Sequence, residues 1–155
     1  MQFVDLLRFF FFSSIEYVAL LIFMFVLYRI GFSHYKPQIA FVCVSLSYVS
    51  WTMRGDGLSH YSPLVQLLLL VVLLWMLFQI QLFYAAIMAV TGYFSYVVIQ
   101  TTVIFVGDLL HLVKPDTLKP LSWETEILAV ISSMITILIS SLVKKKNLGF
   151  AFVPH

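Results

Sequence analysis

The sequence predicts an all-α, polytopic transmembrane bundle of about five helices. Of its 155 residues, 62% are hydrophobic and 10% are charged, whereas a soluble domain carries roughly 25% charged residues. A second observation is a stretch without any charge from Leu64 to Val106. Together they exclude a soluble globular protein, a disordered chain and a nucleic-acid-binding protein. The single cysteine, Cys43, excludes an intramolecular disulfide.

Apolar segments long enough for a bilayer core of about 30 Å define the predicted spans. Arg29 closes the first segment, Pro37 suits the first turn of the second, and Ser62 before Pro63 is expected to be a helix N-cap. A turn is expected at residues 54–57. The predicted spans are residues 9–30, 37–53, 63–78, 82–106 and 122–143.

The charge-free stretch is too long for one crossing. As a single helix it would extend roughly 65 Å at 1.5 Å per residue, so we expect a hairpin at Gln79 and Gln81. The last span is expected to begin at Ser122, with Glu124 and Glu126 in its first turn favoured by the helix dipole.

An odd number of spans places the termini on opposite sides of the membrane. The basic cluster directly after the last span predicts a cytoplasmic C-terminus and an outer N-terminus. Residues 144–155 then form a basic cytoplasmic tail. Its apolar part, residues 149–154, is expected to dock on the membrane or on another protein. The expected lipid anchors are Trp123, Lys144, Lys145 and Lys146.

Glu16 is the most informative single residue. It lies about a third of the way along the first predicted span, where a carboxylate costs several kcal/mol unless it is paired or protonated. One interpretation is that it faces the bundle interior and binds a cation, a proton or a polar ligand. The alternative is that the helix begins near Ser13, which would leave Glu16 at the outer interface.

Small and hydroxyl-bearing residues recur at helical spacing in three spans and predict close helix packing, with hydroxyls bonding across helices. The three stripes are Cys43, Ser47, Ser50; Ala85, Ala89, Gly92, Tyr96; and Ala129, Ser133, Thr136, Ser140. A second interpretation is a polar cavity. Its expected lining is Gln66, Tyr96, Gln100, Thr101 and Thr102.

Charged and polar residues of the outer loops complete the candidate ligand site. They are Arg54, Asp56, His60 and Asp108. His60 and His111 are too far apart in sequence to predict a metal site, so no metal or cofactor is expected. His34 and Cys43 match no peptidase spacing, and the sequence carries none of the common hydrolase or nucleotide-binding motifs. We therefore expect a protein that is not an enzyme.

Several short segments carry a resemblance to a known family. They are Arg54-Gly55-Asp56-Gly57-Leu58-Ser59, Phe83-Tyr84-Ala85-Ala86, Gly92-Tyr93 and Leu148-Gly149-Phe150-Ala151-Phe152. With the hydropathy pattern, the chain resembles the N-terminal transmembrane sensor region of Gram-positive peptide-pheromone receptor histidine kinases, of the accessory-gene-regulator and competence types. The resemblance implies a multi-pass protein of the bacterial plasma membrane that binds a secreted peptide outside. These 155 residues contain no kinase core.

The leading functional hypothesis is a non-enzymatic sensor that binds a ligand on its outer side and signals to a cytoplasmic partner. The expected partners are the lipid bilayer, a cytoplasmic kinase or another membrane subunit, and a homo-oligomer is left open. Two alternatives stay open as well: a membrane subunit of a transporter, and a structural or assembly subunit of a membrane complex. The identity of the ligand is not predicted.

Overall fold

The computed structural model describes residues 3–55, 61–110 and 123–150, and within these ranges the chain forms helices and no strands. The elements are α1 (Phe3–Leu27), the 3-10 helix η1 (Phe32–Tyr35), α2 (Lys36–Gly55), α3 (Ser62–Phe78), α4 (Leu82–Leu109) and α5 (Trp123–Lys145). The predicted all-α class is therefore confirmed for the described residues.

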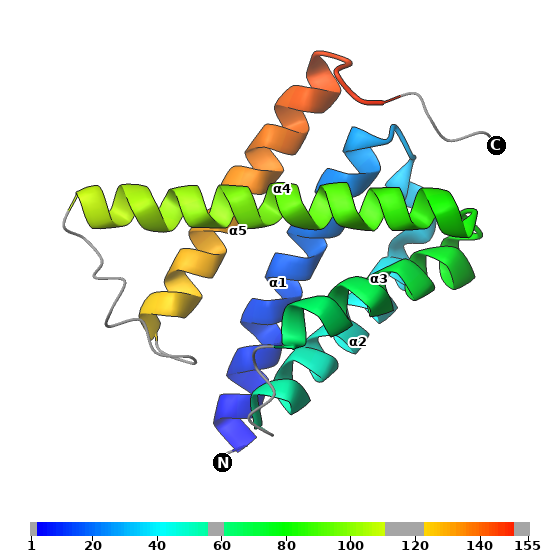
Figure 1. The fold of residues 1–155 in the computed structure, drawn as a ribbon. Helices are drawn as coiled ribbons and strands as arrows, with labels where there is room; N and C mark the ends of the chain where they lie inside the picture. The colour runs from blue at the N-terminus through cyan, green and yellow to red at the C-terminus, as the bar shows by residue number, and fades with distance from the viewer. Residues whose placement is uncertain (1–2, 56–60, 111–122, 151–155) are drawn as a thin grey trace.

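Helix α1 is the centre of the bundle (Figure 1). It packs against α2, α4 and α5, while α3 packs against α2 and α4. Helices α2 and α3 run in opposite directions on one side of α1, and α4 crosses obliquely over α1 and α5. Helices α1 and α5 run in the same direction.

Helix α1 differs from the predicted first segment at both ends. It begins at Phe3 rather than at residue 9 and ends at Leu27 rather than at residue 30. The early start is compatible with burial because Arg8, inside the helix, forms an ion pair with Glu126 of α5. The early end follows from Arg29, whose φ of 56° is left-handed and therefore breaks the helix.

The break expected at Gln79 and Gln81 is present. Helix α3 ends at Phe78, Gln79 is its left-handed C-cap with φ 55°, and α4 begins at Leu82. At the start of α3 the prediction was wrong by one residue, because Tyr61 is the N-cap. Ser62 is helical, and its hydroxyl oxygen accepts a hydrogen bond of 2.7 Å from the Gln66 amide.

The other predicted boundaries differ by smaller steps. Helix α2 includes residues 54 and 55, which were expected in a turn, and α5 continues to Lys145 rather than ending at residue 143. Helix α4 continues to Leu109 rather than ending at residue 106. At 1.5 Å per residue its 28 residues extend about 42 Å. A helix longer than the bilayer core fits by tilting.

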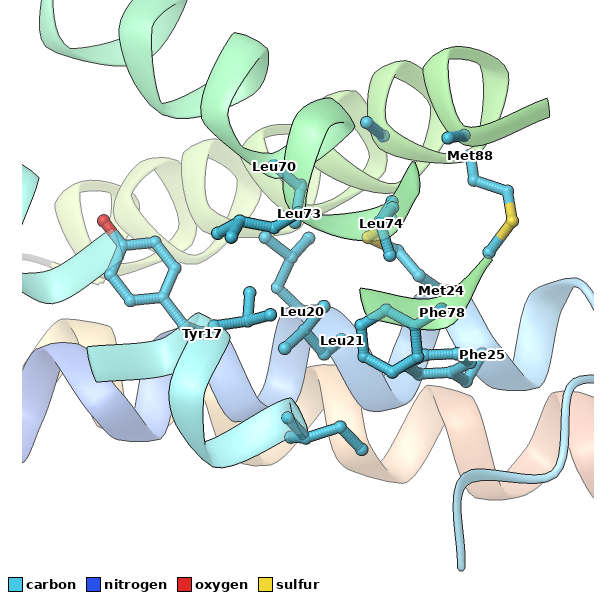
Figure 2. Close-up of a cluster of buried hydrophobic side chains, with 14 of the residues drawn as sticks. Tyr17, Leu20, Leu21, Met24, Phe25, Leu70, Leu73, Leu74, Phe78 and Met88 are labelled. Carbon is cyan, nitrogen blue, oxygen red and sulfur yellow. The ribbon is translucent and has the colours of Figure 1, made fainter. Parts of the chain in front are cut away.

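The core lies where α1, α2, α3 and α4 meet, and Figure 2 shows part of it. Leu21 and Phe25 of α1 face Leu74 and Phe78 of α3, and the rings of Phe25 and Phe78 are 5.0 Å apart between centroids. Tyr35 of η1 lies against both rings, at 6.2 Å and 5.2 Å. This aromatic cluster fixes the end of the bundle opposite the N-terminus.

The three stripes of small residues form buried helix faces, as the packing interpretation predicts. Every member is buried: Cys43, Ser47 and Ser50 in α2, Ala85, Ala89, Gly92 and Tyr96 in α4, and Ala129, Ser133, Thr136 and Ser140 in α5. The expected hydrogen bonding across helices is largely wrong. In α5 the hydroxyls of Ser133, Thr136 and Ser140 donate to carbonyls four residues earlier in the same helix.

Three described helices are long and apolar enough to cross a membrane: α1, α4 and α5. Helix α3 is apolar but shorter, with 17 residues. Large apolar side chains such as Phe11, Phe83 and Phe94 are at least 60% exposed, which is the surface expected of a protein solvated by lipid. These features are those of a membrane protein with a helical bundle.

Candidate functional site

A cavity of about 480 Å³ lies at the end of the bundle that holds the N-terminus of α1. All five α-helices contribute to its wall: residues 9–20 of α1, the end of α2, the start of α3, residues 93–100 of α4 and the first turns of α5. It is partly open to the surface of the molecule. Every helix supplies at least one polar lining residue.

Glu16 points to this cavity from the middle of α1 and is partly buried. Because α1 begins at Phe3, the alternative in which the helix begins near Ser13 is wrong. The Tyr96 hydroxyl of α4 donates a hydrogen bond of 3.2 Å to Glu16 Oε1. The same hydroxyl lies 3.4 Å from Ser133 Oγ of α5. Tyr96 therefore links the carboxylate of α1 to α4 and α5.

The predicted polar cavity is present in part. Gln66, Tyr96 and Gln100 line it together with Glu16. Thr101 and Thr102 are exposed and do not line it. The Thr102 hydroxyl donates instead to the Val98 carbonyl oxygen.

The outer-loop residues are not brought into this cavity. Asp108 is exposed in the last turn of α4. The side chain of Arg54 and the whole of Asp56, His60 and His111 lie outside the described residues. The Trp123 side chain also lies outside them. The lysines expected as lipid anchors, Lys144, Lys145 and Lys146, are exposed at the end of α5.

The ion pair between Arg8 and Glu126 was not predicted from the sequence. The Arg8 Nε donates to Glu126 Oε1 at 2.9 Å, and the two side chains are 21% and 8% exposed. Glu126 lines the cavity, and its second oxygen, Oε2, is buried without a hydrogen-bond partner among the described residues. No local signal distinguishes Glu126 from its exposed neighbour Glu124, because only the pairing of α5 with α1 buries it.

The opposite end of the bundle holds a second cavity of about 320 Å³ beside the chain that leaves α5. Gly149 lies against the carbonyl oxygens of Val26 and Leu27. The Phe150 backbone N–H donates a hydrogen bond of 2.6 Å to the Leu27 carbonyl oxygen. The Arg29 guanidinium donates to the Asn147 carbonyl oxygen. Gly149 and Phe150 therefore dock on α1 of their own chain. Residues 151–154 lie outside the described residues, so the expected docking of the tail on the membrane or on another protein stays a prediction.

Cys43 is 2% exposed inside α2, which fits a structural thiol in the packed face. In the described part of the chain, no three histidine, cysteine or acidic side chains come together as a metal site would require.

Comparisons with family models, curated proteins and solved structures found no match. The resemblance to receptor kinases therefore stays a prediction from the sequence.

Proposed function

We propose that this chain is a non-enzymatic membrane receptor that binds a small polar ligand in the cavity at the N-terminal end of α1. In this proposal the chain crosses the cell membrane five times, with the N-terminus outside and the C-terminus cytoplasmic. Helix α2, with 20 residues, and α3, with 17, would each extend roughly 25–30 Å. That length is close to the bilayer core, which supports five crossings.

The observation that carries the proposal is the convergence of all five α-helices on one partly open cavity lined by both polar and apolar side chains. A cavity of this size falls within the range of small-molecule sites, roughly 300–1,000 Å³. With the N-terminus outside, the cavity would lie toward the outer side of the membrane. A ligand there would contact every helix and would favour whichever arrangement of the helices binds it better.

Helix α5 supplies a route to the cytoplasmic side. It lines the cavity through Glu126 and Ala129 and continues to the exposed basic residues Lys144 and Lys145. The contacts of Gly149 and Phe150 with α1 join the two helices again at that end. A shift of α5 against α1 would therefore change the surface that a cytoplasmic partner meets.

A carrier is the second candidate, and the position of Glu16 favours it. The residue lies near the middle of the candidate span Asp5–Leu27. Carboxylates at that depth often mark ion or substrate paths. A carrier would expose the site to each side in turn, whereas a receptor would open it to one side only.

Labelling from the two sides of the membrane separates these candidates. Gln100→Cys in a Cys43→Ala background places a thiol in the cavity wall, and Val98→Cys, on the exposed apolar face of the same helix, is the matched control. A membrane-impermeant maleimide is added to right-side-out and inside-out vesicles, because thiolates react only where water reaches them.

The receptor requires labelling of Gln100→Cys from the outer side alone, with Val98→Cys unlabelled. Labelling of Gln100→Cys from both sides would contradict the receptor and favour the carrier. Absence of labelling from either side would contradict both candidates and would favour an assembly subunit whose cavity is filled by partner helices.

A further inference from the structure

We propose that the ligand of this cavity is a small organic amine in its protonated form, with its ammonium group bound at Glu126. The inference rests on the proposed function and specifies the chemical class of the ligand. It is carried by the unpartnered oxygen of a buried carboxylate in the cavity wall, together with the charge and the aromatic character of that wall.

Only one of the two carboxylate oxygens of Glu126 has a hydrogen-bond partner among the described residues. The residue is 7% exposed, Oε1 accepts from Arg8, and Oε2 has no partner among the described residues. A buried carboxylate oxygen without a donor costs free energy, of the order of 1–3 kcal/mol or more for a charged group. A ligand that donates an N–H group to Oε2 would recover that free energy on binding.

The charges at the cavity favour a cation over an anion. Among the described residues of its wall, two are carboxylates, Glu16 and Glu126, and none is basic. The guanidinium of Arg8 forms an ion pair with Glu126. This acidic lining matches a ligand that carries a positive charge better than it matches an anion.

The aromatic part of the cavity wall favours a ligand that also carries an apolar group. Four aromatic side chains besides Tyr96 line the cavity: Phe9, Phe12, Tyr17 and Tyr93. Aromatic faces attract ammonium groups and bury apolar groups. A protonated amine with an aromatic or aliphatic body satisfies the carboxylates and the rings together, whereas a bare metal ion would leave the rings without a contact.

The test uses three probes of similar shape on the purified full chain in detergent. 2-Phenylethylamine is a cation with N–H donors at neutral pH, 2-phenylethanol is its neutral counterpart, and the trimethylated ammonium derivative is a cation without N–H donors. Isothermal titration calorimetry should show the amine binding at least about tenfold more tightly than each of the other two, because only the amine supplies both charge and donor. Equal affinities for the amine and the alcohol would overturn the inference.

Matched variants locate the site. Glu126→Gln should lower the affinity for 2-phenylethylamine about tenfold or more. Glu124→Gln, the same change at an exposed position two residues away, should leave it unchanged. Because Glu126→Gln removes the ion pair between Glu126 and Arg8, the double variant Arg8→Gln/Glu126→Gln tests the same loss with both members of the pair neutral. Wild-type affinity in that double variant, or equal losses in both single variants, would place the amine elsewhere.

The test of the ligand class and the test of the proposed function can fail independently. If Gln100→Cys labels from the outer side but the amine does not bind, the receptor stands and the ligand class is wrong. If Gln100→Cys does not label from the outer side, the proposed function itself fails.

Discussion

Substituting Gly92 by alanine tests the close approach of α1 and α4. A Cβ atom at position 92 would lie 2.1 Å from Met24 Cγ and 2.8 Å from its Sδ, so Met24 would have to leave its position. Overpacking of this kind costs about 1–3 kcal/mol. Alanine also gains about 1 kcal/mol over glycine inside a helix. The net expectation is a loss of stability of up to about 2 kcal/mol in Gly92→Ala.

The sign of the effect should reverse when Met24 is alanine. The remaining contact, from position 92 to Met24 Cβ, is an ordinary 3.5 Å. In that background Gly92→Ala should therefore stabilise by about 1 kcal/mol through helix propensity alone. The pair of residues would then show a coupling free energy of about 1–3 kcal/mol in a double-mutant cycle.

Unfolding by SDS in mixed micelles, followed by circular dichroism, measures these free energies. Gly31→Ala is the matched control, because a Cβ there meets no atom within 4 Å and its φ of −71° suits alanine. It should change stability by less than about 1 kcal/mol. If Gly92→Ala stabilises the protein equally in both backgrounds, α1 and α4 do not approach as described.

Three further predictions concern other parts of the fold. Gln79→Gly should stabilise the α3–α4 hairpin by about 0.5–1 kcal/mol, measured by the same SDS unfolding, because glycine adopts the left-handed φ of 55° without strain; a loss of stability would contradict that conformation. Gly149→Ala should push the tail off α1, since its Cβ would lie 2.8 Å from the Leu27 carbonyl oxygen; hydrogen exchange of the Phe150 amide should then accelerate about tenfold or more, and an unchanged rate would refute the docking. Cys43, 2% exposed, should react with N-ethylmaleimide only after unfolding in SDS, so rapid labelling of the native protein would show that α2 is not packed as described.

Local features of the sequence were sufficient to predict where most of the helices lie along the chain. The break at Gln79 and Gln81 follows from the length of the charge-free stretch, because one helix of that length exceeds a bilayer. The buried faces of α2, α4 and α5 follow from small residues at helical spacing, because only small side chains allow helix backbones to approach closely in lipid. The early start of α1 was missed, since Arg8 inside an apolar helix reads as a boundary until its partner is known.

Only some residues of the candidate site could be predicted from the sequence. Glu16 is conspicuous because a carboxylate within an apolar segment is costly, and Tyr96 and Gln100 follow from the polar stripe of α4. Glu126 resembles an ordinary first-turn acidic residue favoured by the helix dipole. Its burial depends on α5 lying parallel to α1 with the two helix starts side by side.

The sequence by itself determined that the chain is helical, where most helices end, and that lipid suits most of its surface, because these properties depend on composition and on spacing within one segment. The tertiary structure decided which helices pair, that Arg8 meets Glu126, and that residues 148–150 return to the end of α1. Lipid is as apolar as a protein core, so hydrophobicity cannot indicate which apolar face turns inward. That choice depends on the fit between side chains far apart in the chain.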